Sequence, residues 1–170
     1  MPEKAKRHFM KEKESKELLN TASQLLGVDV RKLLDAKANI EVVESQGMQV
    51  ILAEGKPVLV KDDARTYPAL TFTELLNTLP KAVVDMGAVP HVCKGANIMA
   101  PGVRHYEGEF QKGNYVLVVD EKYGKPLALG QAVHSVEEAR NTKQGAVVTN
   151  VHFVGDKAWN LMKKLAEANR

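Results

Sequence analysis

The most informative ten residues of this sequence read KGANIMAPGV and cover residues 94–103. Gly95 stands before a short apolar run, and the Pro101-Gly102 pair follows that run. Glycine tolerates the left-handed backbone that ends a helix, and a Pro-Gly pair favours a tight turn with backbone N–H groups facing outward. The segment therefore predicts a helix end, a short strand and a turn in close succession, an arrangement suited to a phosphate.

The residues around this segment are cationic. Between Met86 and Tyr106 the chain carries Lys94, Arg104 and two histidines but no Asp or Glu, although 26% of the whole chain is charged. The formal net charge of +3 falls entirely in residues 80–170, which hold 12 Lys and Arg against 9 Asp and Glu. Residues 1–79 hold 12 of each. If either half binds a polyanion, the pattern favours the second half.

The apolar pattern predicts an α+β protein with two domains, at residues 1–79 and 80–170. The first is a small α/β domain with an N-terminal stretch lying on the surface and an amphipathic helix from about Glu14 to Gly27. A short helix capped by Asp29, strands at 40–43, 48–53 and 57–60, and a helical stretch after Tyr67-Pro68 complete it. In the second domain we expect short strands at 82–84, 97–99, 115–119, 127–132 and 146–153. Glycines lie between or within these strands, which is typical of a small curved barrel. Three helices are expected in this domain. The first follows Asp85, the second begins at the capping box of Ser135 and Glu138, and the third is the final stretch that contains Trp159.

Composition excludes several classes of protein. No stretch approaches the roughly 18 apolar residues of a membrane span, and the charged N-terminal segment lacks a signal-peptide core. The single cysteine, Cys93, excludes an internal disulfide and a thiolate zinc cluster, so a cytoplasmic location is expected. Metal-ligand spacing and nucleotide-binding glycine patterns are missing, so we expect no metal and no cofactor. We interpret His152 as a structural histidine and Ser135 as a helix cap, which leaves no catalytic residue and no expected enzyme.

The second half resembles the PUA domain. The matching pieces are VVDMGAVPHVCKGANIMAPGV (83–103), GNYVLVVD (113–120), PLALGQAV (126–133) and GAVVTNVHFVGDKAW (145–159). A helix, three strands and a Tyr-Pro-x-Leu element at 67–70 extend the resemblance over nearly the full chain, to malignant T-cell amplified protein and its archaeal relatives. The resemblance implies a β pseudo-barrel that recognises structured RNA through its glycine-bearing loop, and a translation-associated role.

The predicted RNA-binding residues lie in this loop and beside it: Lys94, Gly95, Ala96, Asn97, Met99, Pro101, Gly102, Val103, Arg104, His105 and Lys157. Lysine and arginine would contact phosphates, and Arg104 is the strongest candidate because a guanidinium can pair bidentately with phosphate and stack on a base. Asn97 and the Ala96 backbone would bond a base edge or a 2′-OH, although an Asn that caps its own turn fits equally. His105 and Tyr106 are expected in a loop as stacking surfaces. Gly95 and Gly102 either admit a phosphate or only shape the fold.

Two functions remain open at this point. The first is a non-catalytic RNA-binding protein whose targets are tRNA or small-subunit ribosomal RNA. The alternative is a protein-interaction subunit of a translation initiation or recycling complex, in which the charge-balanced first half binds a translation factor or the small ribosomal subunit. An RNA-modifying enzyme is disfavoured because residues 1–79 show no acid–base or nucleophile set.

Overall fold

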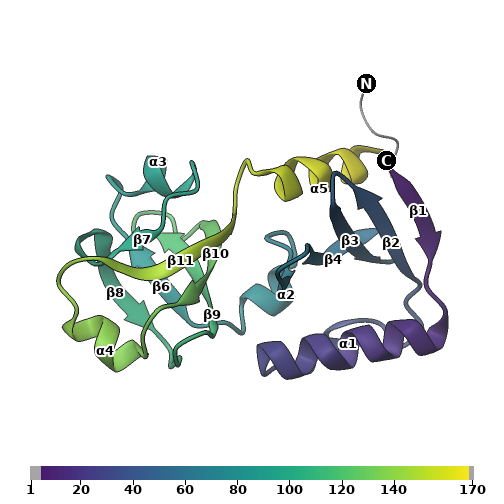
Figure 1. Ribbon diagram of the computed structural model, residues 1–170, viewed down its shortest axis with the longest axis horizontal. Helices are drawn as coiled ribbons and strands as arrows, with labels where there is room; N and C mark the ends of the chain where they lie inside the picture. The colour runs from purple at the N-terminus through teal and green to yellow at the C-terminus, as the bar shows by residue number, and fades with distance from the viewer. Residues whose placement is uncertain (1–4, 169–170) are drawn as a thin grey trace. The chain divides into compact units, whose positions relative to one another are not determined.

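The computed structural model describes residues 5–168 of the chain. The molecule divides into two compact units (Figure 1). The described parts of Met1–Asn77 and Asn160–Arg170 form unit 1, and Thr78–Trp159 forms unit 2. The described residues from Asn160 onward therefore belong with unit 1, although the sequence prediction assigned them to the second domain. The domain ranges 1–79 and 80–170 stay a prediction. None of the helices within residues 5–168 has the length and apolar character that crossing a bilayer requires.

Unit 1 is an antiparallel sheet with helices, in the strand order β1-β2-β3-β4-β5. Its elements are β1 (Lys6–Phe9), α1 (Glu12–Leu26), η1 (Val30–Leu33), β2 (Ile40–Ser45), β3 (Met48–Ala53), β4 (Lys56–Lys61), β5 (Thr66–Pro68) and α2 (Thr73–Leu76). Gly27 closes α1 with a left-handed backbone, as predicted, and Asp29 accepts a hydrogen bond from the backbone N–H of Arg31 to start η1. Both residues of the Gln46-Gly47 and Glu54-Gly55 turns have positive φ, which joins β2, β3 and β4 as tight hairpins.

The strand β1 was not predicted from the sequence. All its side chains are exposed, so it carries no alternating apolar pattern. Backbone pairing with β2 forms it, with Arg7 opposite Val43, and the Arg7 guanidinium forms an ion pair with Glu41 on β2. The surface-lying stretch expected at the N-terminus is thus an ordered edge strand over these residues.

Unit 2 is a mixed sheet in the strand order β7-β11-β10-β9-β6-β8, in which only β6 and β9 run parallel. Its elements are β6 (Lys81–Val84), α3 (Val89–Val92), β7 (Ile98–Met99), η2 (Ala100–Gly102), β8 (Val103–Glu107), β9 (Tyr115–Asp120), β10 (Pro126–Ala132), α4 (Val136–Asn141) and β11 (Ala146–Phe153). The last helix, α5 (Lys157–Ala168), begins in this unit and continues in unit 1.

The two edge strands of this sheet, β7 and β8, are consecutive in the chain. Only η2 separates them, so Met99 and Val103 are only a few residues apart in the chain. Their Cα atoms can therefore be at most about 14 Å apart. A sheet whose two edges are tied this closely must curl until they meet, which produces a pseudo-barrel. We call residues 94–104, which contain this connection, the seam. The α+β class and the pseudo-barrel expected from the sequence are confirmed.

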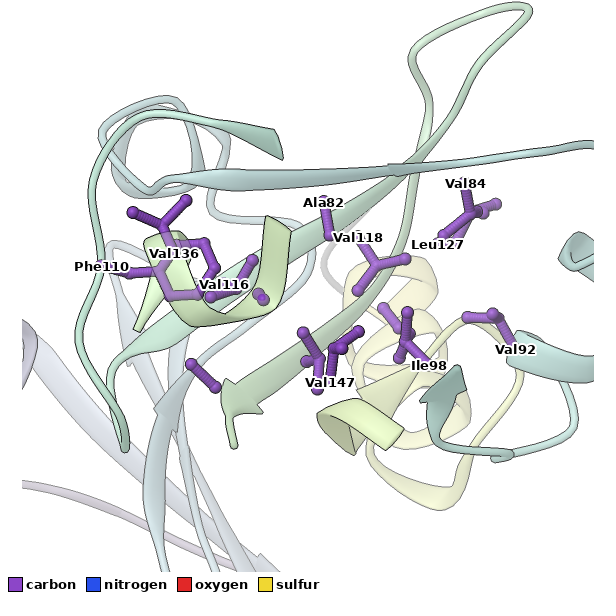
Figure 2. Packing of buried hydrophobic residues seen from close by; sticks show 14 residues of the cluster. Ala82, Val84, Val92, Ile98, Phe110, Val116, Val118, Leu127, Val136 and Val147 are labelled. Carbon is purple, nitrogen blue, oxygen red and sulfur yellow. The ribbon is translucent and has the colours of Figure 1, made fainter. Parts of the chain in front are cut away.

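Small and β-branched side chains fill the barrel. The buried cluster combines alternating residues of β6 and β9 with residues of β10, β11 and α4, with Phe110, and with one side chain each from α3 and β7 (Figure 2). Phe110 lies beside Val136 of α4, whose backbone N–H donates to the Phe110 carbonyl at 3.0 Å. Val92 and Ile98 bring the α3 end and the seam into the same core. The segment that closes the barrel is therefore anchored from inside.

Candidate nucleic-acid interface

The loop between α3 and β7 is fastened to the barrel by Asn150 of β11. The Asn150 Nδ2 donates to the carbonyls of Val92 at 3.1 Å and Ala96 at 3.0 Å. In return, the Asn97 Oδ1 accepts from the Asn150 backbone N–H at 3.0 Å. The acceptors of Ala96 and Asn97 that were expected to contact RNA thus serve the fold.

Three consecutive backbone donors of this loop are also used internally. Lys94 N–H and Ala96 N–H both donate to the His91 carbonyl at 3.1 Å, and Gly95 N–H donates to the Val92 carbonyl at 3.0 Å. Anion affinity at this loop must therefore come from side chains rather than from a cradle of amides.

Two glycines permit the close packing of the loop for different reasons. Gly95 has φ +95°, and a Cβ there would stand 3.0 Å from the Phe153 ring, so both backbone conformation and space require glycine. Gly102 has no positive φ, but a Cβ would stand 3.2 Å from the Ala88 Cβ. The helix end at Gly95 and the turn at Gly102 agree with the sequence prediction.

Lys94 and Arg104 are both exposed. Among the described residues Lys94 has no carboxylate partner, whereas the Arg104 Nε donates to the Glu121 Oε2 at 3.0 Å. The Glu121 Oε1 accepts from the Met86 backbone N–H at 3.4 Å. The acid-free run of sequence is therefore not an acid-free surface, because Glu121 comes from another part of the chain.

His105 and Tyr106 lie on the edge strand β8 and not in a loop, which corrects the sequence prediction. The exposed His105 ring stands 3.5 Å from the Glu107 carboxylate. Tyr106 is half-buried, its ring packs edge-on against Phe110 at 5.8 Å, and burial raises its pKa. Tyr106 thus supports the core and does not offer a free stacking face.

The remaining predicted residues divide between surface and core. Met99, with 48% of its surface exposed, and Pro101 lie outward on the seam, whereas Val103 is half-buried against the barrel core. Lys157 is exposed at the first position of α5, just after the Phe153 whose ring lies against Gly95. The seam thus has a basic, partly apolar outer side.

Asn150 and Glu121 were missed by sequence reasoning. A polar residue inside the apolar strand AVVTNVHF needs a hydrogen-bond partner, so Asn150 left a signal that could have been read. Glu121 left none, because its position beside Arg104 depends on β8 and β9 flanking the same strand.

His152 has the structural role expected for it. It is fully buried, and its Nδ1 lies 2.8 Å from the Asp156 Oδ2, which also accepts from Phe153 N–H. The Asp156 Oδ1 accepts from Trp159 N–H and starts α5. Desolvation would raise the pKa of Asp156, but the bonds from His152 and the two backbone amides outweigh it and lower that pKa. Within the described residues, no three His, Cys, Asp or Glu side chains gather as a metal ion would need.

Comparison with known proteins agrees with this geometry. Residues 80–154 match the model of the PUA domain, so the barrel with its seam is a PUA domain. Residues 6–74 match the model described as Domain of unknown function (DUF1947). The chain belongs to the family of PUA-domain proteins that carry this domain at the N-terminal side.

Its relatives extend from archaea to eukaryotes. An uncharacterized protein of Methanocaldococcus jannaschii is 32% identical over 158 residues, covering 91% of this chain and 96% of that protein. Translation machinery-associated protein 20 of Saccharomyces cerevisiae is 27% identical and covers 77% of each chain. Malignant T-cell-amplified sequence 1 of Danio rerio is 28% identical, covering 78% of this chain and 76% of that protein. The resemblance stated from the sequence is confirmed.

A solved structure matches the fold over the same range. The crystal structure of a hypothetical protein from Pyrococcus horikoshii has a TM-score of 0.76 and 32% identity, covering 92% of this chain and 99% of that chain. Both units therefore have a solved counterpart within one chain.

Proposed function

We propose that this chain is a non-catalytic RNA-binding protein that works with the translation machinery, and that unit 2 receives the ribose-phosphate backbone of a structured RNA at the seam. One observation carries the proposal: the PUA match contains a seam whose outer side presents Lys94 and Arg104 to solvent. Because the loop amides are used internally, these two side chains and Lys157 supply the charge that attracts phosphate.

The other residues of the proposed site act around these cations. Met99 and Pro101 offer apolar surface to a ribose or base, and His105 lies beside Arg104 on β8. Gly95, Ala96, Asn97, Gly102 and Val103 give the seam its shape. The name of the yeast relative supports a place in translation, and the family resemblance favours tRNA or small-subunit ribosomal RNA as the target.

The same chemistry argues against catalysis. The buried His152 is held by Asp156, and the Ser135 hydroxyl accepts from Glu138 N–H at the start of α4. A nucleophile oriented by a base is therefore not available at these positions. A probable tRNA pseudouridine synthase B of Pyrobaculum arsenaticum matches 46% of this chain but only 24% of its own length, so that likeness carries no enzymatic activity over.

The test is a matched set of charge variants of the full chain, assayed for tRNA binding by anisotropy at several salt concentrations. Lys94→Ala with Arg104→Ala should weaken binding and lower the slope of log K against log salt by about 2, one for each phosphate contact. Lys56→Ala with Lys61→Ala removes two exposed charges from β4 of unit 1 and serves as the control. Glu121→Gln should strengthen binding, because it frees Arg104 from its carboxylate. Thermal stability should be unchanged, since both cations are exposed.

The alternative is a protein-interaction subunit that uses unit 1. A cleft of about 820 Å³ in that unit favours it, because Lys16, Arg31, Lys32 and Lys37 line it together with Glu12, Asp29 and Asp35. Unchanged RNA affinity in the Lys94 and Arg104 double variant would favour this alternative over RNA binding.

A further inference from the structure

The turn between β9 and β10 presents an exposed aromatic ring between two lysines. Tyr123 keeps 64% of its surface exposed, and Lys122 and Lys125 place their Nζ atoms 5.1 Å and 5.8 Å from the ring centroid. Among the described residues, neither lysine has a carboxylate within ion-pair distance. We call residues 121–125 the Tyr123 turn.

Asp120 holds this turn in place. Its buried carboxylate accepts backbone hydrogen bonds from Tyr123 and from Lys125 at 3.1 Å, and Gly124 N–H donates to the Asp120 carbonyl. The bond from the Tyr123 amide is the main cause that lowers the pKa of Asp120. The ring therefore projects from an ordered turn, which reduces the entropy lost when a ligand stacks on it.

The strand register puts the Tyr123 turn at the same end of the barrel as Arg104. Val84 of β6 pairs with Val103 on one side and with Asp120 on the other, so the two strands stand about 10 Å apart there. Glu121 joins them through its contacts with Arg104 and the Met86 backbone. The backbone at Met86 is thus joined to the first residue of the Tyr123 turn.

We propose that the Tyr123 turn is a second contact site for RNA, at which Tyr123 stacks on an unpaired base while Lys122 and Lys125 contact the phosphates beside it. The inference rests on the RNA-binding function proposed above and adds a single-stranded part to the target. An exposed ring can stack only on a base that lies outside a helix, because bases in an A-form duplex already stack on each other. The two unpaired cations favour nucleic acid over a neutral apolar partner.

The two lysines can make room for a base on the Tyr123 ring at little cost. Exposed cation–π contacts are weak, so each ammonium can move from the ring to a neighbouring phosphate when a base takes its place. Each contact of this kind adds about 0.7 to the salt slope of single-strand binding, and the two together add about 1.4.

The test uses the full chain and an RNA hairpin with a short unpaired 3′ tail that contains 2-aminopurine, compared with the same hairpin ending blunt. Tyr123→Ala should weaken binding of the tailed hairpin about five- to a hundredfold and abolish the quenching of 2-aminopurine. Tyr123→Phe should bind nearly as the parent does, because stacking needs the ring and not the hydroxyl. Lys122→Ala with Lys125→Ala should lower the salt slope by about 1.4.

Controls separate this site from other effects. Phe9→Ala removes an aromatic side chain of unit 1 that is 68% exposed, and should leave affinity unchanged. Urea unfolding of Tyr123→Ala should match the parent, because the ring contributes little buried surface.

Each outcome decides between the two proposals. If Tyr123→Ala binds the tailed hairpin as the parent does while the Lys94 and Arg104 variant binds it weakly, the second site is refuted and the proposed function stands. If the parent binds neither hairpin, the proposed function itself fails. If Tyr123→Ala loses the same affinity for the tailed and the blunt hairpin, stacking on an unpaired base is refuted. Polyglutamate serves as a second, acidic probe. If Tyr123→Ala loses binding to polyglutamate but not to RNA, the turn contacts an acidic protein instead.

Discussion

Gly130 lies on β10 between its two neighbouring strands, β9 and β11. It pairs with Val116 on one side and Asn150 on the other, at a break in the β10–β11 register between Leu129 and Gly130. A Cβ at this position would lie 2.2 Å from the Val148 Cγ1 and 2.6 Å from the Thr149 carbonyl oxygen. Gly130→Ala therefore tests how tightly the barrel is packed.

The size of the effect follows from these distances. The Val148 methyl could rotate away, but the Thr149 oxygen belongs to the neighbouring strand and can move only with its backbone. Overpacking of a core costs about 1–3 kcal/mol, and this site belongs at the upper end. Replacing glycine by alanine also returns about 0.4–1 kcal/mol by restricting the unfolded chain. We expect a net loss of about 2 kcal/mol.

The assay is equilibrium unfolding in urea, with two glycines as controls. Gly113→Ala has a positive φ and nothing within 4 Å of the added Cβ, so left-handed strain alone should cost about 1 kcal/mol. Gly87→Ala has no positive φ and meets only the Asp85 carboxylate at 3.3 Å, so it should cost little. If Gly130→Ala is no more destabilising than Gly87→Ala, the close approach of β10 and β11 is refuted.

Two further predictions concern buried polar groups. Asp156→Asn should destabilise the protein by about 1–3 kcal/mol at neutral pH, because a charge-assisted partner of His152 is lost. Since the folded pKa of Asp156 lies below its ordinary value of 3.8, this contribution is complete above about pH 5 and disappears as the pH falls through the folded pKa. Unfolding measured from pH 7 to pH 2 should show the two proteins converge, and a gap independent of pH would contradict this. Asn150→Ala removes two hydrogen bonds but also a buried, unpartnered Oδ1, so we expect a loss of only about 1 kcal/mol. Amide exchange should nevertheless accelerate at residues 94–97, and unchanged exchange would mean that Asn150 does not hold the loop.

Local signals in the sequence were enough for most elements of the fold. Gly27 ends α1, Asp29 starts η1 and the Ser135 hydroxyl caps α4, each through a bond to a neighbouring residue. Runs of apolar and β-branched residues located β3, β9 and β11, because all their side chains are buried or half-buried. Short-range chemistry of this kind is visible in one sequence.

The strands β1 and β8 escaped prediction for a common reason. Both are edge strands with mainly exposed side chains, so only pairing with distant partners, β2 and β6, creates them. The same limit applies to the candidate site. Lys94 and Arg104 could be identified as exposed cations, but the Glu121 carboxylate beside Arg104 comes from the turn after β9, which the local pattern does not connect to it.

The seam has a consequence for how this protein tolerates breaks in its chain. The edge strands β7 and β8 already carry unpaired backbone donors and acceptors, and cutting between Met99 and Val103 would remove the connection that keeps these two edges together. A nicked molecule would then pair edge to edge with its neighbours, so proteolysis at this loop should lead to aggregation rather than to loss of binding alone. Insertions should be tolerated far better in the Gly124 or Gly145 turns, because neither one joins the ends of the sheet.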